Sequence, residues 1–190
     1  MAIVTAAEPT PDALRAALSE PDALYEIVDG QIVEVPGMSV YASVIARRLM
    51  EAIRAAARPA RLGAAMIETM FILDAEKNLR RRPDVAFVST ERWPFARPLP
   101  TEGDFEVVPD LVIEVVSPQD RGGEIAKKTR EYFRHNVRQV WIVLPETREI
   151  AIYRSPKTIE VFEEGDEFTA EDLLPGLRIR MDDLFSTAID

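Results

Sequence analysis

Cysteine is absent from the 190-residue chain, which excludes disulfides, zinc–thiolate sites and cysteine nucleophiles. This absence fits a reducing compartment, and we expect a cytoplasmic location. Histidine occurs once, as His135, so imidazole chemistry rests on that residue or is absent. No apolar run approaches the roughly 18 residues of a membrane-spanning helix, and residues 1–11 lack the basic and apolar segments of a secretion signal. We therefore expect no membrane partner.

Positive charges are outnumbered by negative ones, with 23 Lys and Arg against 33 Asp and Glu, so the formal net charge is −10. This balance argues against a protein that coats nucleic acid through a generally basic surface. A local basic patch nevertheless lies between residues 121 and 138. Its candidate nucleic-acid contacts are Arg121, Lys127, Arg130 and Arg134. Ordinary solvation of a helix surface is the alternative explanation for these charges.

The length and the 47% hydrophobic content are typical of an ordinary globular protein. We expect an N-terminal extension over residues 1–19 that contains a short helix at 10–19. Thr10 suits the cap of this helix, and Pro11 suits its first position. A single domain is expected over residues 20–190.

Hydrophobic periodicity predicts the elements of this domain. Alternation around Asp29-Gly30 predicts a hairpin over residues 25–35, and a 3.6-residue period predicts a helix over 39–58. Similar patterns predict strands at 63–73, 83–88, 111–116, 137–144, 149–153 and 158–162, a helix at 122–135 and a helical turn at 181–185. The strand–helix–strand step over 110–144 predicts a right-handed parallel crossover. We therefore expect an α/β (α+β) fold with a mixed central sheet flanked by helices and with C-terminal antiparallel strands.

Glu114 stands inside the apolar strand Leu111–Val116, where an ionised carboxylate is costly unless it is paired or binds a metal. Pro83-Asp84 opens the preceding strand. If the two strands are neighbours, Asp84 and Glu114 converge, and converging carboxylates suit a hard cation such as Mg²⁺. The alternatives are a turn role for Asp84 and a basic structural partner for Glu114.

Lys128 shares a helix face with Ile125 and Tyr132, which should direct it toward the sheet and Glu114. The alternative is a lysine stem that lies on the apolar face while its ammonium reaches water. Tyr132 is interpreted as a core residue. Metal-assisted phosphodiester hydrolysis needs carboxylates to hold the ion, and it gains from a lysine that orients the nucleophile or stabilises the transition state.

With these residues in place, the chain resembles the PD-(D/E)XK nuclease superfamily and, within it, the Uma-two family of endonucleases. The stretches that carry the resemblance are 25–30, 82–85, 109–118 and 128–132 followed by 140–143. The resemblance implies a restriction-endonuclease-like core, DNA as substrate, and Asp84 and Glu114 as ligands of Mg²⁺ or Mn²⁺. The superfamily's lysine stands two residues after the glutamate, where this chain has Val116. The family takes its lysine from the following helix, and Lys128 matches that position.

Two further acids are candidate auxiliary residues. Glu26, in the family-like hairpin, could reach the site or could be an exposed strand carboxylate. Asp110 lies on the same strand face as Glu114 but about 13 Å away, at about 3.3 Å per residue. We therefore expect Asp110 at the strand entrance, with an indirect role toward the ion if any.

The sequence thus predicts a Mg²⁺-dependent DNA endonuclease, and a homodimer because two-fold related sites suit the cutting of both strands. An alternative function is also open. The family's first helix often carries a histidine near its start, and residues 39–43 contain none. A nuclease fold without cleavage, acting as a DNA-binding or protein-interaction module, is the alternative prediction.

Overall fold

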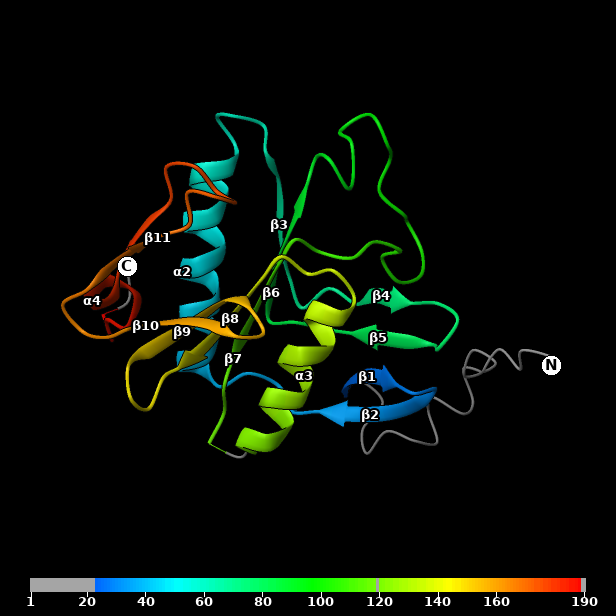
Figure 1. Ribbon diagram of the computed structural model, residues 1–190, viewed down its shortest axis with the longest axis horizontal. Helices are drawn as coiled ribbons and strands as arrows, with labels where there is room; N and C mark the ends of the chain where they lie inside the picture. The colour runs from blue at the N-terminus through cyan, green and yellow to red at the C-terminus, as the bar shows by residue number, and fades with distance from the viewer. Residues whose placement is uncertain (1–22, 119, 189–190) are drawn as a thin grey trace.

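The computed structural model describes residues 23–118 and 120–188, so the helix expected at 10–19 lies outside the described residues. At its centre is a six-stranded mixed sheet in the order β10-β9-β8-β7-β6-β3 (Figure 1). Its strands are β3 (Gly63–Ile67), β6 (Val85–Ser89), β7 (Leu111–Val115), β8 (Gln139–Leu144), β9 (Glu149–Ser155) and β10 (Thr158–Phe162). The mixed α and β composition confirms the predicted fold class.

Strands β7 and β8 form the parallel pair of this sheet, and helix α3 (Gly122–Arg134) connects them. The predicted strand–helix–strand crossover is therefore present. Strand β6 pairs with β7 in antiparallel orientation, with Val85 opposite Ile113. The strand that follows Asp84 and the strand that contains Glu114 are therefore neighbours, which is the condition under which the two carboxylates were expected to converge.

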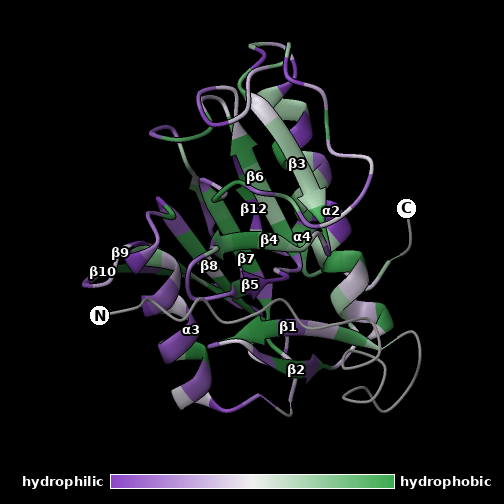
Figure 2. Cartoon of the chain, turned by 90° about the vertical axis from the view of Figure 1, so that its right-hand side faces the viewer, coloured by the Kyte–Doolittle hydropathy of each residue, from purple (hydrophilic) through white to green (hydrophobic). Residues whose placement is uncertain are grey.

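The two faces of the central sheet belong to different cores. Helix α2 (Val40–Ala57), capped by Ser39, packs on one face together with β11 (Glu167–Thr169), β12 (Arg178–Arg180) and α4 (Met181–Leu184). Ile113 and Val115 point into this core, whereas Val112 points into the core that contains Tyr132 of α3. Because side chains alternate along a strand, Glu114 faces α3. In Figure 2 the central strands are coloured mainly as hydrophobic residues and α3 mainly as hydrophilic residues.

A second, four-stranded sheet has the order β2-β1-β5-β4 and lies on the α3 side. Its strands are β1 (Leu24–Val28), β2 (Gln31–Val35), β4 (Phe71–Asp74) and β5 (Leu79–Arg81). Strands β1 and β2 form the predicted hairpin. Its turn residues Asp29 (φ 51°) and Gly30 (φ 75°) are both left-handed, which the Asp-Gly pair tolerates.

The single strand predicted over 63–73 is wrong, because the chain changes sheets within it. Strand β3 ends at Ile67 and stays in the central sheet, and β4 begins at Phe71 in the second sheet. Glu68 between them has a left-handed backbone (φ 44°) and donates its N–H to the Asp84 carbonyl at 3.1 Å. Only two polar residues, Glu68 and Thr69, interrupt the apolar pattern before Met70, so the hydrophobic pattern gives only a weak sign of the break.

Candidate active site

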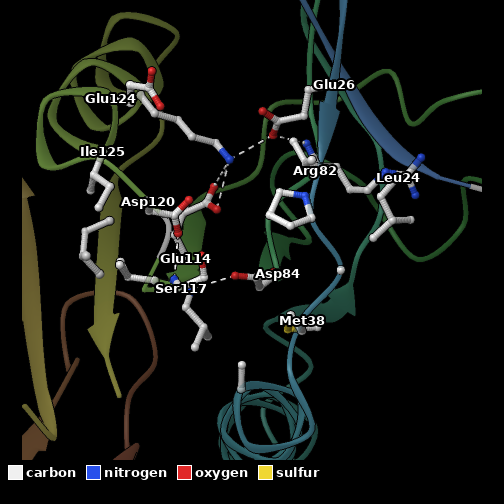
Figure 3. A pocket seen from close by; sticks show the side chains of 18 of the residues that line it. Leu24, Glu26, Met38, Arg82, Asp84, Glu114, Ser117, Asp120, Glu124 and Ile125 are labelled. Carbon is white, nitrogen blue, oxygen red and sulfur yellow. Dashed lines mark hydrogen bonds and ion pairs between the residues drawn. The ribbon is translucent and has the colours of Figure 1, made fainter. Parts of the chain in front are cut away.

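A cleft of about 830 Å³ lies between the β1–β2 hairpin, the end of β7 and the first turns of α3 (Figure 3). Glu26, Asp84, Glu114 and Lys128 all line it, and we call it the carboxylate cleft. It contains the three residues that the sequence predicted as a catalytic group. The hairpin, the central sheet and the crossover helix therefore all contribute charged groups to one place.

Glu114 has two partners from α3. The Lys128 ammonium lies 3.0 Å from both carboxylate oxygens, and the Tyr132 hydroxyl donates to Oε1 at 2.6 Å. Burial raises the pKa of Glu114, although the charge of Lys128 opposes the shift. The basic partner anticipated as an alternative is therefore present, and it is the proposed catalytic lysine itself.

Lys128 is directed inward as its helical spacing predicted, and its side chain is 22% exposed. The ammonium lies 2.9 Å from Oε1 of Glu26 as well as 3.0 Å from Glu114. Burial alone would lower the pKa of Lys128, but the charges of Glu114 and Glu26 outweigh burial and raise it. Lys128 therefore remains an ammonium at neutral pH and can donate hydrogen bonds but cannot act as a base.

Asp84 lies just before β6, and its Oδ2 accepts the N–H of Val115 at 2.6 Å. Burial, and secondarily the charge of Glu114, raise the pKa of Asp84 to about 7. Within the described part of the chain, no ion pair neutralises this carboxylate. An ionised Asp84 is thus energetically unfavourable until a cation approaches it.

The cleft offers a divalent metal two carboxylate ligands rather than a complete set of protein ligands. Across residues 23–118 and 120–188, no group of three or more His, Cys, Asp or Glu side chains is arranged to hold an ion. Asp84 and Glu114 provide two carboxylates, and Asp84 forms no ion pair with the residues that the structure describes. Mg²⁺ commonly binds through one or two carboxylates and keeps several waters, so two ligands suit it.

Glu26 is 2% exposed, so the alternative of an exposed strand carboxylate is wrong. Its Oε2 lies 2.6 Å from the guanidinium of Arg81 on β5, and its Oε1 accepts the N–H of Arg82 at 2.9 Å. Burial opposes ionisation, but the charges of Lys128 and Arg81 outweigh it and lower the pKa of Glu26. The pairing of β1 with β5 thus brings a third carboxylate into the cleft.

Asp110 lies outside the carboxylate cleft, at the opposite end of β7 from Glu114. It is 1% exposed, accepts the N–H of Ser89 at 2.8 Å, and forms ion pairs with Arg92 (3.0 Å) and Arg138 (3.6 Å). These contacts join β7 to the segments around it. Asp110 therefore has structural contacts in the fold and does not contact the cleft.

The basic candidates on α3 are exposed. Arg121 occupies the N-cap position, and Lys127 lies on the cleft lining. Arg130 and Arg134 follow Lys127 at helical spacing on the outer surface. Only Lys127 of these four therefore reaches the cleft directly.

Sequence reasoning missed two contributors. Tyr132 is buried as predicted, but its hydroxyl also orients Glu114, and its spacing of four residues from Lys128 could have indicated this. Arg81 holds Glu26, yet it lies in the run Arg80-Arg81-Arg82, which as a sequence suggests solvated charge. Nothing in that run distinguishes the buried arginine from its neighbours.

Comparisons with known proteins identify a family and a similar fold. A sequence model of the Uma2 family, described as "Putative restriction endonuclease", matches residues 11–182. The fold is similar to a crystal structure of a "putative nuclease belonging to DUF820 from Anabaena variabilis ATCC 29413", with a TM-score of 0.74 and 22% identity over 90% of this chain and 94% of that chain. No curated protein matches the sequence. None of the helices within residues 23–118 and 120–188 has the length and hydropathy of a membrane-spanning segment.

Proposed function

We propose that this chain, which belongs to the Uma2 family, is a divalent-metal-dependent DNA endonuclease that hydrolyses phosphodiester bonds. The observation that carries the proposal is the convergence of Asp84, Glu114 and Lys128 on one cleft, where Asp84 is half-buried and forms no ion pair with the described residues. A binding surface for DNA would not need a carboxylate held in so unfavourable a place. A hydrolytic metal site uses such a carboxylate as a ligand, and the bound cation offsets the cost of its ionisation.

Asp84 and Glu114 are the proposed ligands of Mg²⁺ or Mn²⁺. The bound cation would supply charge neutralisation at the scissile phosphate and activation of water. The Val115 N–H fixes the orientation of Asp84, and the Tyr132 hydroxyl fixes that of Glu114. Both carboxylates are therefore oriented before an ion binds, which lowers the cost of assembling the site.

Lys128 is the proposed donor to the reacting groups. Its raised pKa keeps Lys128 protonated, with three N–H donors, at all physiological pH values. Such a group can orient the attacking water or stabilise negative charge on the phosphate. It cannot remove the proton from water, so the base must be another group.

Basic side chains on α3 are the proposed contacts to the flanking DNA. Lys127, Arg130 and Arg134 span about 10 Å of helix, at 1.5 Å per residue, beginning at the cleft. Arg121 stands at the same end of the helix as the cleft. We also propose a homodimer, because two-fold related sites suit cleavage of both strands, and a cytoplasmic location, because the chain lacks cysteine.

Nicking of supercoiled plasmid in Mg²⁺ or Mn²⁺ tests this proposal. The wild type should cleave, whereas Glu114→Gln and Lys128→Met should each lose about a hundredfold or more in rate. Asp172→Asn, which removes an exposed carboxylate paired with Arg154, is the matched control and should cleave like the wild type. Equal rates in all four proteins would refute the assignment.

One observation favours a second candidate, a nuclease fold that binds without cutting. Lys128 and Tyr132 already satisfy the Glu114 carboxylate, so the fold does not require a cation at that residue. Salt-sensitive plasmid retention without nicking, together with no heat on titration with Mg²⁺, would support such a module. Saturable Mg²⁺ binding would contradict it.

A further inference from the structure

The Lys128 ammonium lies between carboxylates from two different sheets. Glu26 of β1 approaches it at 2.9 Å, and Glu114 of β7 approaches it at 3.0 Å. Figure 3 shows that Glu26 and Glu114 enter the cleft from different elements. If Glu114 binds a cation, the cation and the ammonium compete for the same oxygens. Lys128 then loses one of its two partners.

Glu26 is held in place independently of Glu114. Its Oε2 contacts Arg81 at 2.6 Å, its Oε1 accepts the Arg82 N–H at 2.9 Å, and it is 2% exposed. Arg81 is itself fixed by Glu131 at 2.6 Å. A change in the charge state of Glu114 therefore leaves the contacts of Glu26 intact.

We propose that Glu26 is a positioning residue that keeps the Lys128 ammonium in the carboxylate cleft while Glu114 binds the cation. The inference rests on the proposed function, and it concerns how that site remains assembled. Lys128 reaches the cleft through a flexible four-carbon stem, so it needs a fixed partner when Glu114 binds the cation and no longer pairs with the ammonium. Charge-assisted hydrogen bonds to a buried carboxylate supply one. The N-terminal hairpin thereby becomes part of the catalytic machinery through Glu26.

The first test needs no metal and uses the lysine ammonium signals in ¹⁵N NMR. The chain has four lysines, and Lys77, Lys127 and Lys157 are exposed, so a slowly exchanging ammonium belongs to Lys128. Glu114→Gln imitates the loss of the Glu114 charge. The signal should persist in Glu114→Gln and disappear in the double variant Glu26→Gln, Glu114→Gln. Persistence in the double variant would overturn the inference.

The second test measures Mn²⁺ affinity by calorimetry. In Glu26→Gln the lysine keeps only Glu114, so the ion must displace its last charged partner, and binding should weaken about tenfold. In a Lys128→Met background the same change should have little effect, because the competing ammonium is gone. An equal loss in both backgrounds would overturn the inference.

Glu131→Gln is the control for effects that act through Arg81. Glu131 shares Arg81 with Glu26 but makes no ion pair with Lys128 within the described chain. This variant should leave both the ammonium signal and the Mn²⁺ affinity unchanged, and matching losses would show that Glu26 is merely structural. If the wild type binds no Mn²⁺ and cuts no plasmid, the proposed function fails, while the ammonium signals still decide the role of Glu26.

Discussion

Replacing Asp84 with asparagine should make the metal-free protein more stable at pH 8. Burial and the charge of Glu114 raise the pKa of Asp84 from 3.8 to about 7. The folded state thus binds this proton more tightly than the unfolded state does. Below about pH 4 both states are protonated and there is no penalty, whereas the penalty accumulates between pH 4 and 7 and is complete above 7.

The magnitude follows from the two pKa values. At 1.36 kcal/mol per pH unit, the ionised Asp84 costs the folded state roughly 4 kcal/mol at pH 8. Asparagine can still accept the Val115 N–H through its amide oxygen, but burying its NH₂ group costs about 1–3 kcal/mol. The expected net gain at pH 8 is therefore about 1–3 kcal/mol, or a few degrees to about 10 °C in Tm.

Urea unfolding of the wild type and Asp84→Asn, in EDTA at pH 4.5 and pH 8, measures this effect. The cost of burying the asparagine amide is the same at both pH values. The change in the stability difference between variant and wild type from pH 4.5 to pH 8 therefore reports only the cost of the Asp84 charge. The variant should gain roughly 3–4 kcal/mol on the wild type between pH 4.5 and pH 8. A stability difference that is the same at both pH values would refute the reasoning.

Three further predictions concern neighbouring groups. Mg²⁺ affinity, measured by calorimetry, should weaken by up to about tenfold for each pH unit below 7, because Asp84 must lose its proton to bind the ion. Tyr132→Phe removes the hydroxyl that donates to Glu114, and it should cost about 1–2 kcal/mol in urea unfolding. Asp110→Asn should destabilise the protein by about 1–3 kcal/mol at pH 8, because it breaks the ion pair with Arg92, and plasmid nicking by the folded variant should be unchanged.

The parts of the fold that the sequence predicts are those with a single, continuous periodicity. Helix α2 and the β7–α3–β8 unit follow from such patterns, and they position Glu114 and Lys128. The split between β3 and β4 was not predicted, because both strands are partly apolar and only three residues, 68–70, separate them. Strand β5 is three residues long and contains two arginines, so no apolar pattern indicated it.

The candidate site also contains residues that local sequence patterns predicted and residues that they did not. Asp84, Glu114 and Lys128 could be grouped because an acid in an apolar strand requires a partner and helical spacing supplies a direction for Lys128. The roles of Glu26 and Arg81 depend on the pairing of β1 with β5, which is a long-range contact between charged, short segments. Local sequence patterns carry no information on such a contact.

Plasmid nicking by Asp84→Asn, compared with the wild type in Mg²⁺ at pH 8, tests the central claim most directly. Asp84→Asn keeps the hydrogen bond to Val115 and is expected to be the more stable protein, so loss of cleavage in this variant cannot be attributed to unfolding. The proposed metal site predicts wild-type nicking and loss of at least about a hundredfold in the variant. Nicking at the wild-type rate by Asp84→Asn would contradict it.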